Sequence, residues 1–330
     1  MERLDPMPII SSCDLPDLIK AAKTLLQGNL VAFPTETVYG LGADATNSEA
    51  VAKIYKVKKR PTQHPLIVHI SSVAKIDIWA NKISDSALEL ASAFWPGPLT
   101  LILPRQSVAK NDITGGQDYV AVRVPNNQIA LTLLHEFENR GGIGIVAPSA
   151  NRFGKISPTS ANDVLEELSI YLNSKDRVLD GGESIIGVES TIIDCTGKTP
   201  KILRPGAITP IEIKHRLNIN IEIKTEGSRN KINAPGLLKS HYAPNAEIYL
   251  SGTPSLGDGF IALEKFATPK GAIRLAKPSN NIEYAQVLFK ALRLADSKQI
   301  KKIFIVVPEG NDIALAVRDR LIKASNPRID

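Results

Sequence analysis

The sequence predicts an α/β protein in which helices cover a mixed, twisted sheet. Two observations lead to this prediction. Short apolar runs that fit buried strands recur along the 330 residues, and most are separated by stretches whose apolar residues follow a helical spacing. The character of the chain then changes near residue 210, and its length exceeds that of one typical domain. We therefore expect a second, smaller domain after the first.

The first part of the chain alternates helices and strands. Between residues 14 and 28, apolar side chains recur at helical spacing and Gly28 supplies a left-handed stop. The apolar run 30–34 is typical of a short buried strand. Further helices are expected at 48–58, 84–94 and 127–137, and from the end of the loop 148–159 to about 172. Further strands are expected at 65–70, 99–104, 119–125, 143–147, 177–180, 190–195 and 201–204.

The segment after residue 210 mixes charge, glycine and proline with little periodicity, which indicates an ordered linker or lid. Beyond it, the pattern predicts strands at 247–250 and 302–307, an apolar stretch at 259–263, and helices at 282–295 and 311–324. These elements fit a smaller α/β, Rossmann-like unit. The expected domains are 1–210 and 246–330, with the linker at 211–245 between them.

Composition excludes several classes of protein. With 43% hydrophobic and 22% charged residues, the chain can bury a sizeable globular core. Cys13 and Cys195 are the only cysteines, which argues against a disulfide framework and fits a reducing cytoplasm. No signal-peptide pattern and no apolar run of roughly 18 residues is present, so we expect a cytoplasmic protein without a membrane partner. The net charge of +6 is only a mild bias toward polyphosphate or nucleic-acid partners.

A polar loop follows the strand 30–34. Two threonines, Glu36 and Tyr39 come within five residues, and Gly40 and Gly42 are expected to let the backbone turn tightly. Polar side chains just past the end of a strand are typical of the ligand crevice of an open α/β sheet. A polar turn that caps the next helix would explain the same residues, so both interpretations stay open.

Two basic residues, Lys58 and Arg60, precede Pro61. In an extended segment their side chains would project to the same side and could clamp a triphosphate. The alternative is a solvated helix end, where lysine and arginine favour the carbonyl pole.

Several other polar residues lie in apolar or loop contexts. Arg123 stands inside the apolar strand VAVRVP, where it either pairs with an anion or points to solvent at a sheet edge. His69, in LIVHI, is either a ligand-facing or an ordinary core histidine. The loop 148–159 offers hydroxyls and amides that could bind an anion or cap the following helix.

Generic nucleotide and metal motifs do not explain the chain. The segment from Gly182 to Gly187 has P-loop spacing, but Val188 and Glu189 stand where a lysine and a hydroxyl residue are required. The five histidines show no metal-ligand spacing, so we expect no metal site built by the protein.

Eight motifs together resemble the threonylcarbamoyl-AMP synthase family of YrdC-like proteins, in its longer, two-domain form. The motifs are PTETVYGLGADA (34–45), KVKKRPTQHPLIVHI (56–70), WPGPLTLILP (95–104), VAVRVP (120–125), APSANRFGKISPT (147–159), GVESTIID (187–194), ILRPGAI (202–208) and APGLLKSHYAPNAEIYL (234–250). The last motif marks the longer members. One departure is His64, where the family usually has asparagine.

The resemblance implies an L-threonylcarbamoyladenylate synthase, which converts ATP, L-threonine and bicarbonate or CO₂ into threonylcarbamoyl-AMP and pyrophosphate. The product serves N6-threonylcarbamoyladenosine modification of tRNA, so tRNA threonylcarbamoyl-transferase machinery is an implied downstream partner. Mg²⁺ is expected on the ATP, carried by the nucleotide and water, because no carboxylate cluster suggests a protein cage. The motifs identify no general base, although Glu36 is a candidate.

The resemblance also assigns roles to individual residues. Those that match threonine-holding groups are Thr37, His69, Arg123, Ser149 and Ser190. Those that match ATP-holding groups are Lys58, Arg60, His64, Asn151, Thr159 and Arg204. His241 and Tyr242 lie on the linker, which in the longer members folds back over the site.

The alternative function is an RNA-binding or regulatory module on the same fold, without catalysis. Basic residues suit weak contact with an RNA backbone. However, aromatic residues for base stacking make up only 5% of the chain, and none lies in the main basic stretch, 56–70.

Overall fold

The computed structural model describes residues 7–223, 232, 234–238 and 240–326. The larger unit contains the strands β1 (Ile9–Ser11), β2 (Val31–Phe33), β3 (Gly40–Asp44), β4 (Ile67–His69), β5 (Leu99–Pro104), β6 (Tyr119–Arg123), β7 (Ile145–Val146), β8 (Arg177–Leu179), β9 (Thr191–Asp194), β10 (Lys201–Arg204) and β11 (Glu222–Ile223). Its helices are α1 (Leu15–Leu26), α2 (Ser48–Lys58), α3 (Ile76–Trp79), α4 (Asp85–Phe94), α5 (Asn111–Thr114), α6 (Gln128–Glu138), α7 (Ala161–Leu168) and α8 (Pro210–Leu217). Two 3₁₀ turns are η1 (Val73–Lys75) and η2 (Ser169–Tyr171). The second unit, called the second domain below, contains β12 (Glu247–Tyr249), β13 (Gly259–Ile261), β14 (Ile273–Ala276), α9 (Asn281–Ser297), β15 (Lys302–Ile305) and α10 (Ala314–Ser325).

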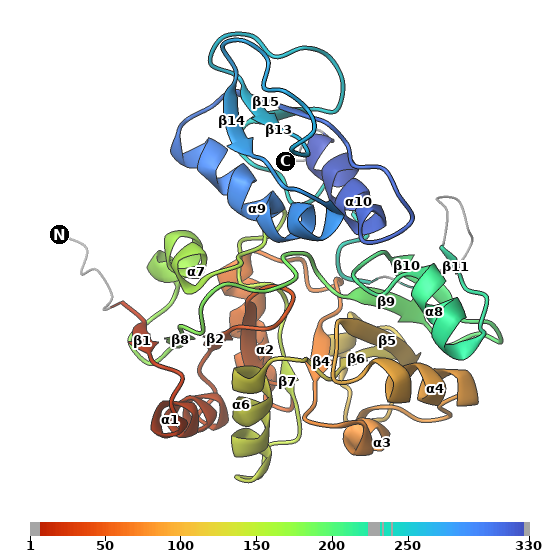
Figure 1. Ribbon diagram of the computed structural model, residues 1–330. Coiled ribbons are helices and arrows are strands. Elements are labelled where there is room, and N and C mark those ends of the chain that lie inside the picture. Colours follow the sequence, from red (N-terminus) through yellow and green to blue (C-terminus); the bar gives the residue numbers. More distant parts are fainter. Residues whose placement is uncertain (1–6, 224–231, 233, 239, 327–330) are drawn as a thin grey trace.

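The described strands form two sheets. The larger sheet has the order β1-β8-β2-β3-β7-β4-β6-β5-β9-β10-β11 and mixes parallel with antiparallel pairs. The smaller sheet has the order β12-β15-β13-β14, and its pairs are parallel. Figure 1 shows the second domain above the larger sheet, with α9 and α10 on the side that faces it. The predicted mixed α/β sheet with a smaller α/β unit after it is confirmed.

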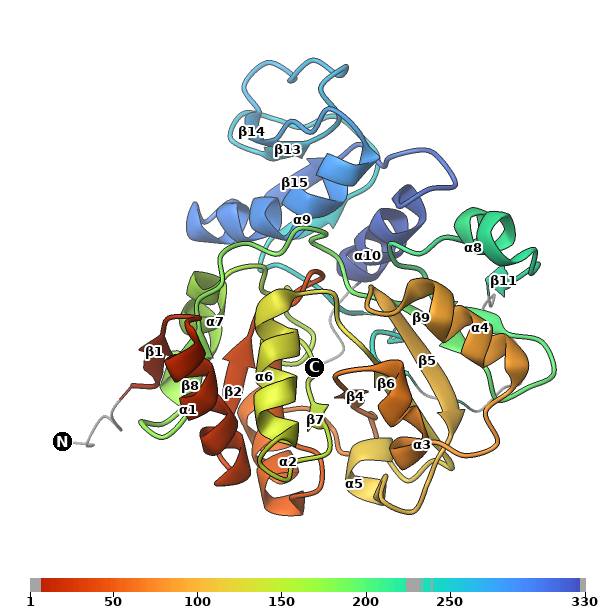
Figure 2. The ribbon, with the colours of Figure 1, turned by 60° about the horizontal axis from the view of Figure 1, so that its bottom comes forward.

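Both faces of the larger sheet are covered, and most side chains of its central strands are apolar and buried. Along β2, Val31 and Phe33 pack in one buried cluster with α1 and α6, while Ala32 joins a second cluster on the opposite face with α2 and α4. In Figure 2, α1 and α6 lie together on the near face of the sheet. At the other end of that same face the covering elements are not helices but residues of the linker, including Ile232 and Ala234.

The second domain shares a buried apolar cluster with the first. The domain's own core centres on α9, whose Tyr284, Leu288 and Phe289 are fully buried. Val38 and Val188 of the first unit belong to the same cluster. Because this contact is apolar and continuous, burial of hydrophobic surface holds the second domain against the first.

The tight turn predicted at Gly40 and Gly42 is wrong. Both glycines lie in β3, which pairs antiparallel with β2. Their small size is required by packing rather than by a turn, since a Cβ atom at Gly42 would lie 2.8 Å from a ring carbon of Phe33 and 3.0 Å from the carbonyl oxygen of Val31.

The segment predicted as a linker begins with a helix. Thr209 caps α8, and Ile213 on this helix is buried in the core of the larger unit. The short strand β11 then pairs with β10. Within the linker, residues 224–231, 233 and 239 lie outside the described residues, and the domain boundaries stay predictions. In the described ranges, the helices lack the combination of length and apolarity needed to cross a membrane.

Candidate functional site

A small, partly open cavity of about 50 Å³ lies over one face of β4 and β6, beneath the linker. Ile67 and His69 point into it because side chains two apart in a strand share a face. The sequence led us to expect a crevice just past the end of a strand. The site lies there only in part, because most of it is on a face of the sheet. Two larger cavities, of about 600 and 790 Å³, contain none of the predicted site residues among their described linings.

Most of the predicted site residues meet at this cavity. Its lining includes all five predicted threonine-binding residues, Thr37, His69, Arg123, Ser149 and Ser190. It also includes Arg60 and Arg204 of the predicted ATP-binding set and the two predicted lid residues, His241 and Tyr242. Lys58, His64, Asn151 and Thr159 lie around it and are described below. The sequence motifs therefore mark one place in the fold, although each residue's role stays a prediction.

Arg123 is buried and is held by several protein groups. Its Nη2 atom lies 2.7 Å from Oε2 of Glu36, and its Nη1 donates a hydrogen bond of 3.0 Å to Oγ1 of Thr37. Its Nε donates to the carbonyl oxygen of Gly97. The alternative of a solvent-facing arginine at a sheet edge is wrong, because β6 lies between β4 and β5. A buried guanidinium next to hydroxyls is a suitable partner for a carboxylate ligand.

His69 is neutral in this environment. It lies opposite Arg123 in the pairing of β4 with β6, and its Nδ1 atom lies 3.3 Å from the carbonyl oxygen of Ile67. Burial, together with the positive charge of Arg123, lowers the pKa of His69 to about 3. A neutral imidazole at the cavity wall can donate or accept a hydrogen bond without adding another positive charge.

Arg204 connects the wall of the cavity to the linker. Its Nε and Nη2 atoms donate to the carbonyl oxygen of Ser190 at 3.1 and 2.9 Å, and Nη2 also donates to Oγ of Ser190 at 3.1 Å. Its Nη1 donates to the carbonyl oxygen of Pro235. The hydroxyl of Ser190 also lies 2.7 Å from that of Thr100. Arg204 therefore fixes Ser190 and places a cation at the base of the linker.

Lys58 and Arg60 do not form the extended pair that the sequence suggested. Lys58 is the last residue of α2, and Lys59 is left-handed with φ of 52°. The side chains of Lys58 and Arg60 are nevertheless buried, so the alternative of a solvated helix end is also wrong. Nζ of Lys58 donates to the carbonyl oxygens of Ser149, at 2.6 Å, and Asn151. The lysine thus holds the loop after β7 against the cavity.

Burial of the charged Lys58 and Arg60 side chains is energetically unfavourable. The pKa of Lys58 is well below its usual value, first because the amino group is desolvated and second because Arg60 is near. Arg60 donates to the carbonyl oxygens of His64 and Pro65 and lies 5.6 Å from the centroid of the Phe153 ring. Neither basic group pairs with a carboxylate among the described ion pairs, so an anionic ligand would offset the cost.

The other predicted ATP-binding residues shape the surrounding loops. The Asn151 side chain donates to the carbonyl oxygens of Arg152 and Lys155, which folds the loop after β7. Thr159 bonds Asp163 through its backbone and hydroxyl, beside the capping box of α7, as in the capping alternative. His64 packs edge-on against Phe153, the aromatic ring that also contacts His241.

The two lid residues close the cavity from the linker side. Both are buried, and their rings lie 4.1 Å apart. Nδ1 of His241 and the hydroxyl of Tyr242 have no hydrogen-bond partner within the described parts of the chain. Burial, with several nearby cations including Arg60, keeps the pKa of His241 well below its usual value. Two residues that line the cavity therefore each carry an unpaired polar atom.

Sequence reasoning missed two residues beside the cavity. Glu189 lines it, and the wholly buried Arg320 of α10 reaches it from the second domain. A signal for Arg320 was present, since it falls at helical spacing among the buried Val317, Leu321 and Ala324. An arginine inside an apolar stripe predicts a buried partner.

Comparison with known proteins places both parts of the chain. Residues 23–206 match the family model described as "Telomere recombination" (Sua5_yciO_yrdC), and residues 208–326 match "Threonylcarbamoyl-AMP synthase, C-terminal domain". The threonylcarbamoyl-AMP synthase of Pyrococcus abyssi is 41% identical over 94% of both chains. That of Bacillus subtilis is 35% identical over 95% of this chain and 94% of its own.

Solved structures agree with these relatives. The crystal structure of P. abyssi Sua5 complexed with L-threonine covers 97% of both chains with a TM-score of 0.84 and 38% identity. A variant of the same protein, in which a histidine and the tyrosine after it are replaced by alanine, superposes with a TM-score of 0.86. Because the matches span both sheets and the linker between them, this chain belongs to the threonylcarbamoyl-AMP synthase family, in its two-domain form.

Proposed function

We propose that this chain is an L-threonylcarbamoyladenylate synthase, a nucleotidyltransferase that converts ATP, L-threonine and bicarbonate or CO₂ into threonylcarbamoyl-AMP and pyrophosphate. Relatives with this name match nearly the whole chain, and one related structure contains L-threonine. The observation that carries the proposal is the meeting of Arg123, three hydroxyl residues and two further arginines at one cavity.

Arg123 and its neighbours suit an amino acid. The guanidinium supports binding of the carboxylate by a charge-assisted hydrogen bond, which is about twice as strong as a neutral one. The hydroxyls of Thr37, Ser149 and Ser190 can accept from or donate to the amine and hydroxyl of threonine. Because His69 is neutral, Arg123 is the positively charged member of this pair, and the carboxylate would lie against it.

Arg60, Arg204 and Lys58 suit the phosphates of ATP. The threonine amine would attack bicarbonate and lose water, which forms a carbamate. A carbamate oxygen would then attack the α-phosphorus in line, and pyrophosphate would leave. Such a displacement needs positioning and neutralisation of charge more than a covalent nucleophile. The described site accordingly offers cations and hydroxyls around the cavity.

The lid residues suit a reaction that water would spoil. Carbamates and mixed anhydrides hydrolyse readily, so a site that excludes water favours the product. The 50 Å³ cavity is far smaller than the roughly 300–1,000 Å³ that ligand sites usually enclose. We therefore propose that His241 and Tyr242 move away to admit the substrates and return to cover them.

Mg²⁺ is proposed to enter the site bound to ATP. Across the described residues, no group of three or more histidines, cysteines, aspartates or glutamates is placed to hold a metal ion. The phosphates and water would supply its ligands, which is common for Mg²⁺. The ion would contribute positive charge to the leaving pyrophosphate.

The proposed product has a defined use. Threonylcarbamoyl-AMP would pass to tRNA threonylcarbamoyl-transferase machinery in the cytoplasm, for N6-threonylcarbamoyladenosine. Weak direct contact with RNA is part of the proposal, but the non-catalytic RNA-binding module is not favoured by the relatives.

The decisive experiment measures pyrophosphate release from ATP with and without L-threonine and bicarbonate. Release that needs both substrates, with threonylcarbamoyl-AMP detected by mass spectrometry, is expected. RNA binding with a steep salt dependence and no pyrophosphate release would instead indicate the binding module.

A further inference from the structure

Arg320 is an unusual residue for its position in the second domain. It lies on α10 and has no exposed surface, although its helical neighbours Val317, Leu321 and Ala324 are apolar core residues. Burying a guanidinium is unfavourable unless its donors are paired. The position of its partners therefore indicates why the helix carries an arginine here.

Arg320 pairs with its neighbour Asp319 on α10, and its other partners lie in the first unit, beside the cavity. Its Nε atom donates to Oε2 of Glu189 at 2.8 Å, and its Nη1 donates to the carbonyl oxygen of Pro205 at 3.0 Å. Glu189 itself lines the cavity and accepts a second hydrogen bond, from Ser157. The two contacted residues are the direct neighbours of Ser190 and Arg204. One side chain from the second domain thus fixes two points of the cavity wall.

The same helix also holds both lid residues. The guanidinium carbon of Arg320 lies 5.3 Å from the centroid of the Tyr242 ring, within cation–π distance. The backbone N–H of His241 donates to the carbonyl oxygen of Lys323 at 3.1 Å. Tyr242 has a left-handed φ of 64°, which a bulky residue adopts only when its surroundings hold it there.

We propose that Arg320 is a positioning residue for the reaction, through which the second domain fixes Glu189 in the cavity wall and Tyr242 over the cavity. The inference rests on the proposed function, because it assigns the second domain a part in that activity. Loss of Arg320 would free the tyrosine and leave Glu189 as a buried carboxylate whose charge is still offset by Arg204.

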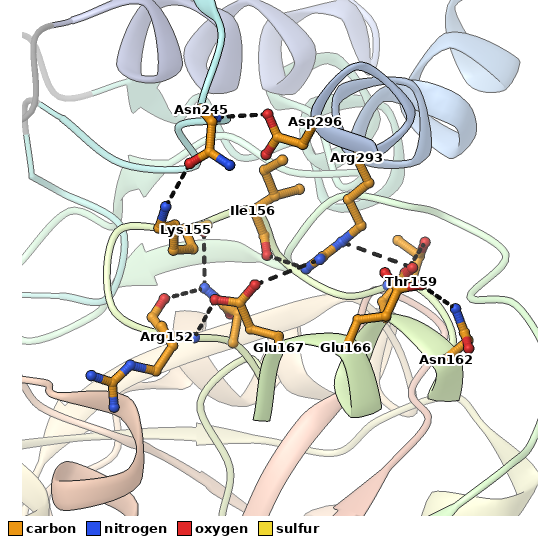
Figure 3. Close-up of polar contacts among 12 residues, drawn as sticks. Arg152, Lys155, Ile156, Thr159, Asn162, Glu166, Glu167, Asn245, Arg293 and Asp296 are labelled. Carbon is orange, nitrogen blue, oxygen red and sulfur yellow. Dashed lines mark hydrogen bonds and ion pairs between the residues drawn. The ribbon is translucent and has the colours of Figure 1, made fainter. Parts of the chain in front are cut away.

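A separate set of contacts, which does not involve Arg320, also joins the second domain to the first. Arg293 of α9 donates to the carbonyl oxygen of Ile156 at 2.6 Å and lies 3.7 Å from Glu167, and Figure 3 shows both contacts. Near it, Asn245 joins the side chains of Lys155 and Asp296. Together with the shared apolar cluster, these contacts attach α9 to the loop before α7. We therefore expect the domains to stay together when Arg320 is replaced.

The test compares Arg320→Met with Lys290→Met in the full-length protein. Both changes replace a basic residue by methionine at the domain contact, but Lys290 pairs with Glu183 at an exposed place. We expect Arg320→Met to raise the KM values for threonine and ATP and to lower kcat/KM by about tenfold or more, as loss of a charged hydrogen bond does. Lys290→Met should stay within about twofold of the parent protein.

A second readout does not depend on activity. Chymotrypsin cuts after tyrosine, so cleavage after Tyr242, followed by mass spectrometry, reports whether the lid is seated. Without substrates, cleavage there should be at least about tenfold faster in Arg320→Met than in the parent protein, while cleavage after the exposed Phe266 should stay unchanged. Absence of pyrophosphate release in the parent protein would refute the proposed function, and this cleavage would still test the positioning role.

The conservative variant keeps the test usable if methionine prevents folding. Arg320→Lys retains a charge for Glu189 but lacks the planar fork that reaches Pro205 and covers the tyrosine ring. It should fold, and its kinetic constants and its rate of cleavage after Tyr242 should lie between those of the parent protein and Arg320→Met. Parent-like kinetics and cleavage in either variant, or equal effects of Arg320→Met and Lys290→Met, would overturn the proposal.

Discussion

The Nη2 atom of Arg123 lies 2.7 Å from Oε2 of Glu36, and both side chains are almost completely buried. Glu36 thus neutralises the cation that we propose for the carboxylate of threonine. Its other oxygen, Oε1, has no hydrogen-bond partner in the described part of the chain. A bound amino acid would bring a second carboxylate to the same guanidinium. The charge balance of the site therefore depends on the ligand.

Replacement of Glu36 by glutamine tests whether Glu36 and the ligand carboxylate both balance the charge of Arg123. We expect Glu36→Gln to lower the free energy of unfolding by about 3 kcal/mol, because Arg123 is left as a buried cation without a counter-charge. Added L-threonine should then raise the melting temperature more in the variant than in the parent protein, since its carboxylate supplies the missing negative charge. Thermal unfolding with and without L-threonine measures both effects.

Glu183→Gln is the matched control for this prediction. Glu183 pairs with Lys290, but both side chains are more than half exposed, so loss of that pair should change stability little. Equal threonine-induced shifts in Glu36→Gln and the parent protein would contradict the link between Glu36 and the ligand carboxylate.

Substitution of Arg60 tests the nucleotide side of the cavity. Arg60→Ala should raise the KM for ATP ten- to a hundredfold, because a charge-assisted contact with phosphate contributes roughly 1.5–3 kcal/mol. The KM for L-threonine should change much less. Steady-state pyrophosphate release at varied ATP and then at varied threonine gives the two constants.

Lys56→Ala provides the comparison, because Lys56 is an exposed basic residue on the neighbouring turn of α2. It should leave both constants within about twofold of the parent values. If Arg60→Ala also leaves the ATP dependence unchanged, Arg60 serves only to hold the carbonyl groups of His64 and Pro65.

The sequence predicted most helices and long strands because their signals are local. The helical spacing of apolar residues before Gly28, for example, predicted α1 to within two residues at each end. The strand β1 was not predicted, because it forms by pairing with β8, more than 160 residues later in the chain. The strand β14 was missed because it alternates only weakly between apolar and polar residues.

The site was predicted from the resemblance to family motifs rather than from the spacing of apolar residues. Periodicity left Arg123 equally suited to a core and to a solvent edge, and only the position of β6 inside the sheet decides it. Likewise, Lys58 is buried because carbonyl groups some 90 residues later accept its hydrogen bonds. Arg320 belongs to no motif, and its partners in the first unit, Glu189 and Pro205, are over 100 residues away. Such contacts cannot be derived from local spacing.

The buried His69 should make stability depend on pH. Its pKa is about 3 in the folded protein and near 6.5 when unfolded, so the unfolded chain binds the proton more readily. The stability from the neutral ring is complete above pH 6.5 and is lost as the pH falls from there toward 3. His69→Asn should reduce the slope of unfolding free energy against pH in that window by up to about 1.4 kcal/mol per unit.

Denaturant unfolding at several pH values between 4 and 7 measures this slope. His135→Gln is the control, because His135 is exposed on α6 and should leave the slope unchanged. An identical slope in His69→Asn and the parent protein would show that His69 does not stay neutral in the folded state.

Choice of amino acid should depend on the threonine hydroxyl. Valine has nearly the same shape but would leave buried polar partners unpaired, so its kcat/KM should be roughly 10⁴-fold lower. Serine lacks only the methyl group and should lose about 1–3 kcal/mol, or 10- to 200-fold. Pyrophosphate release with each amino acid measures the ratio, and equal rates with valine and threonine would refute a threonine-specific site.

The lid residues should protect the product as well as bind substrates. In His241→Ala/Tyr242→Ala, the two rings that close the cavity are removed, so water would reach the carbamate and the mixed anhydride. We expect less threonylcarbamoyl-AMP per pyrophosphate released, in addition to a lower rate, and mass spectrometry alongside a pyrophosphate assay gives this ratio. The control His215→Ala/Tyr249→Ala removes an exposed histidine and a partly exposed tyrosine elsewhere and should keep the parent ratio. A lower rate with an unchanged ratio would mean that the lid binds substrates but does not exclude water.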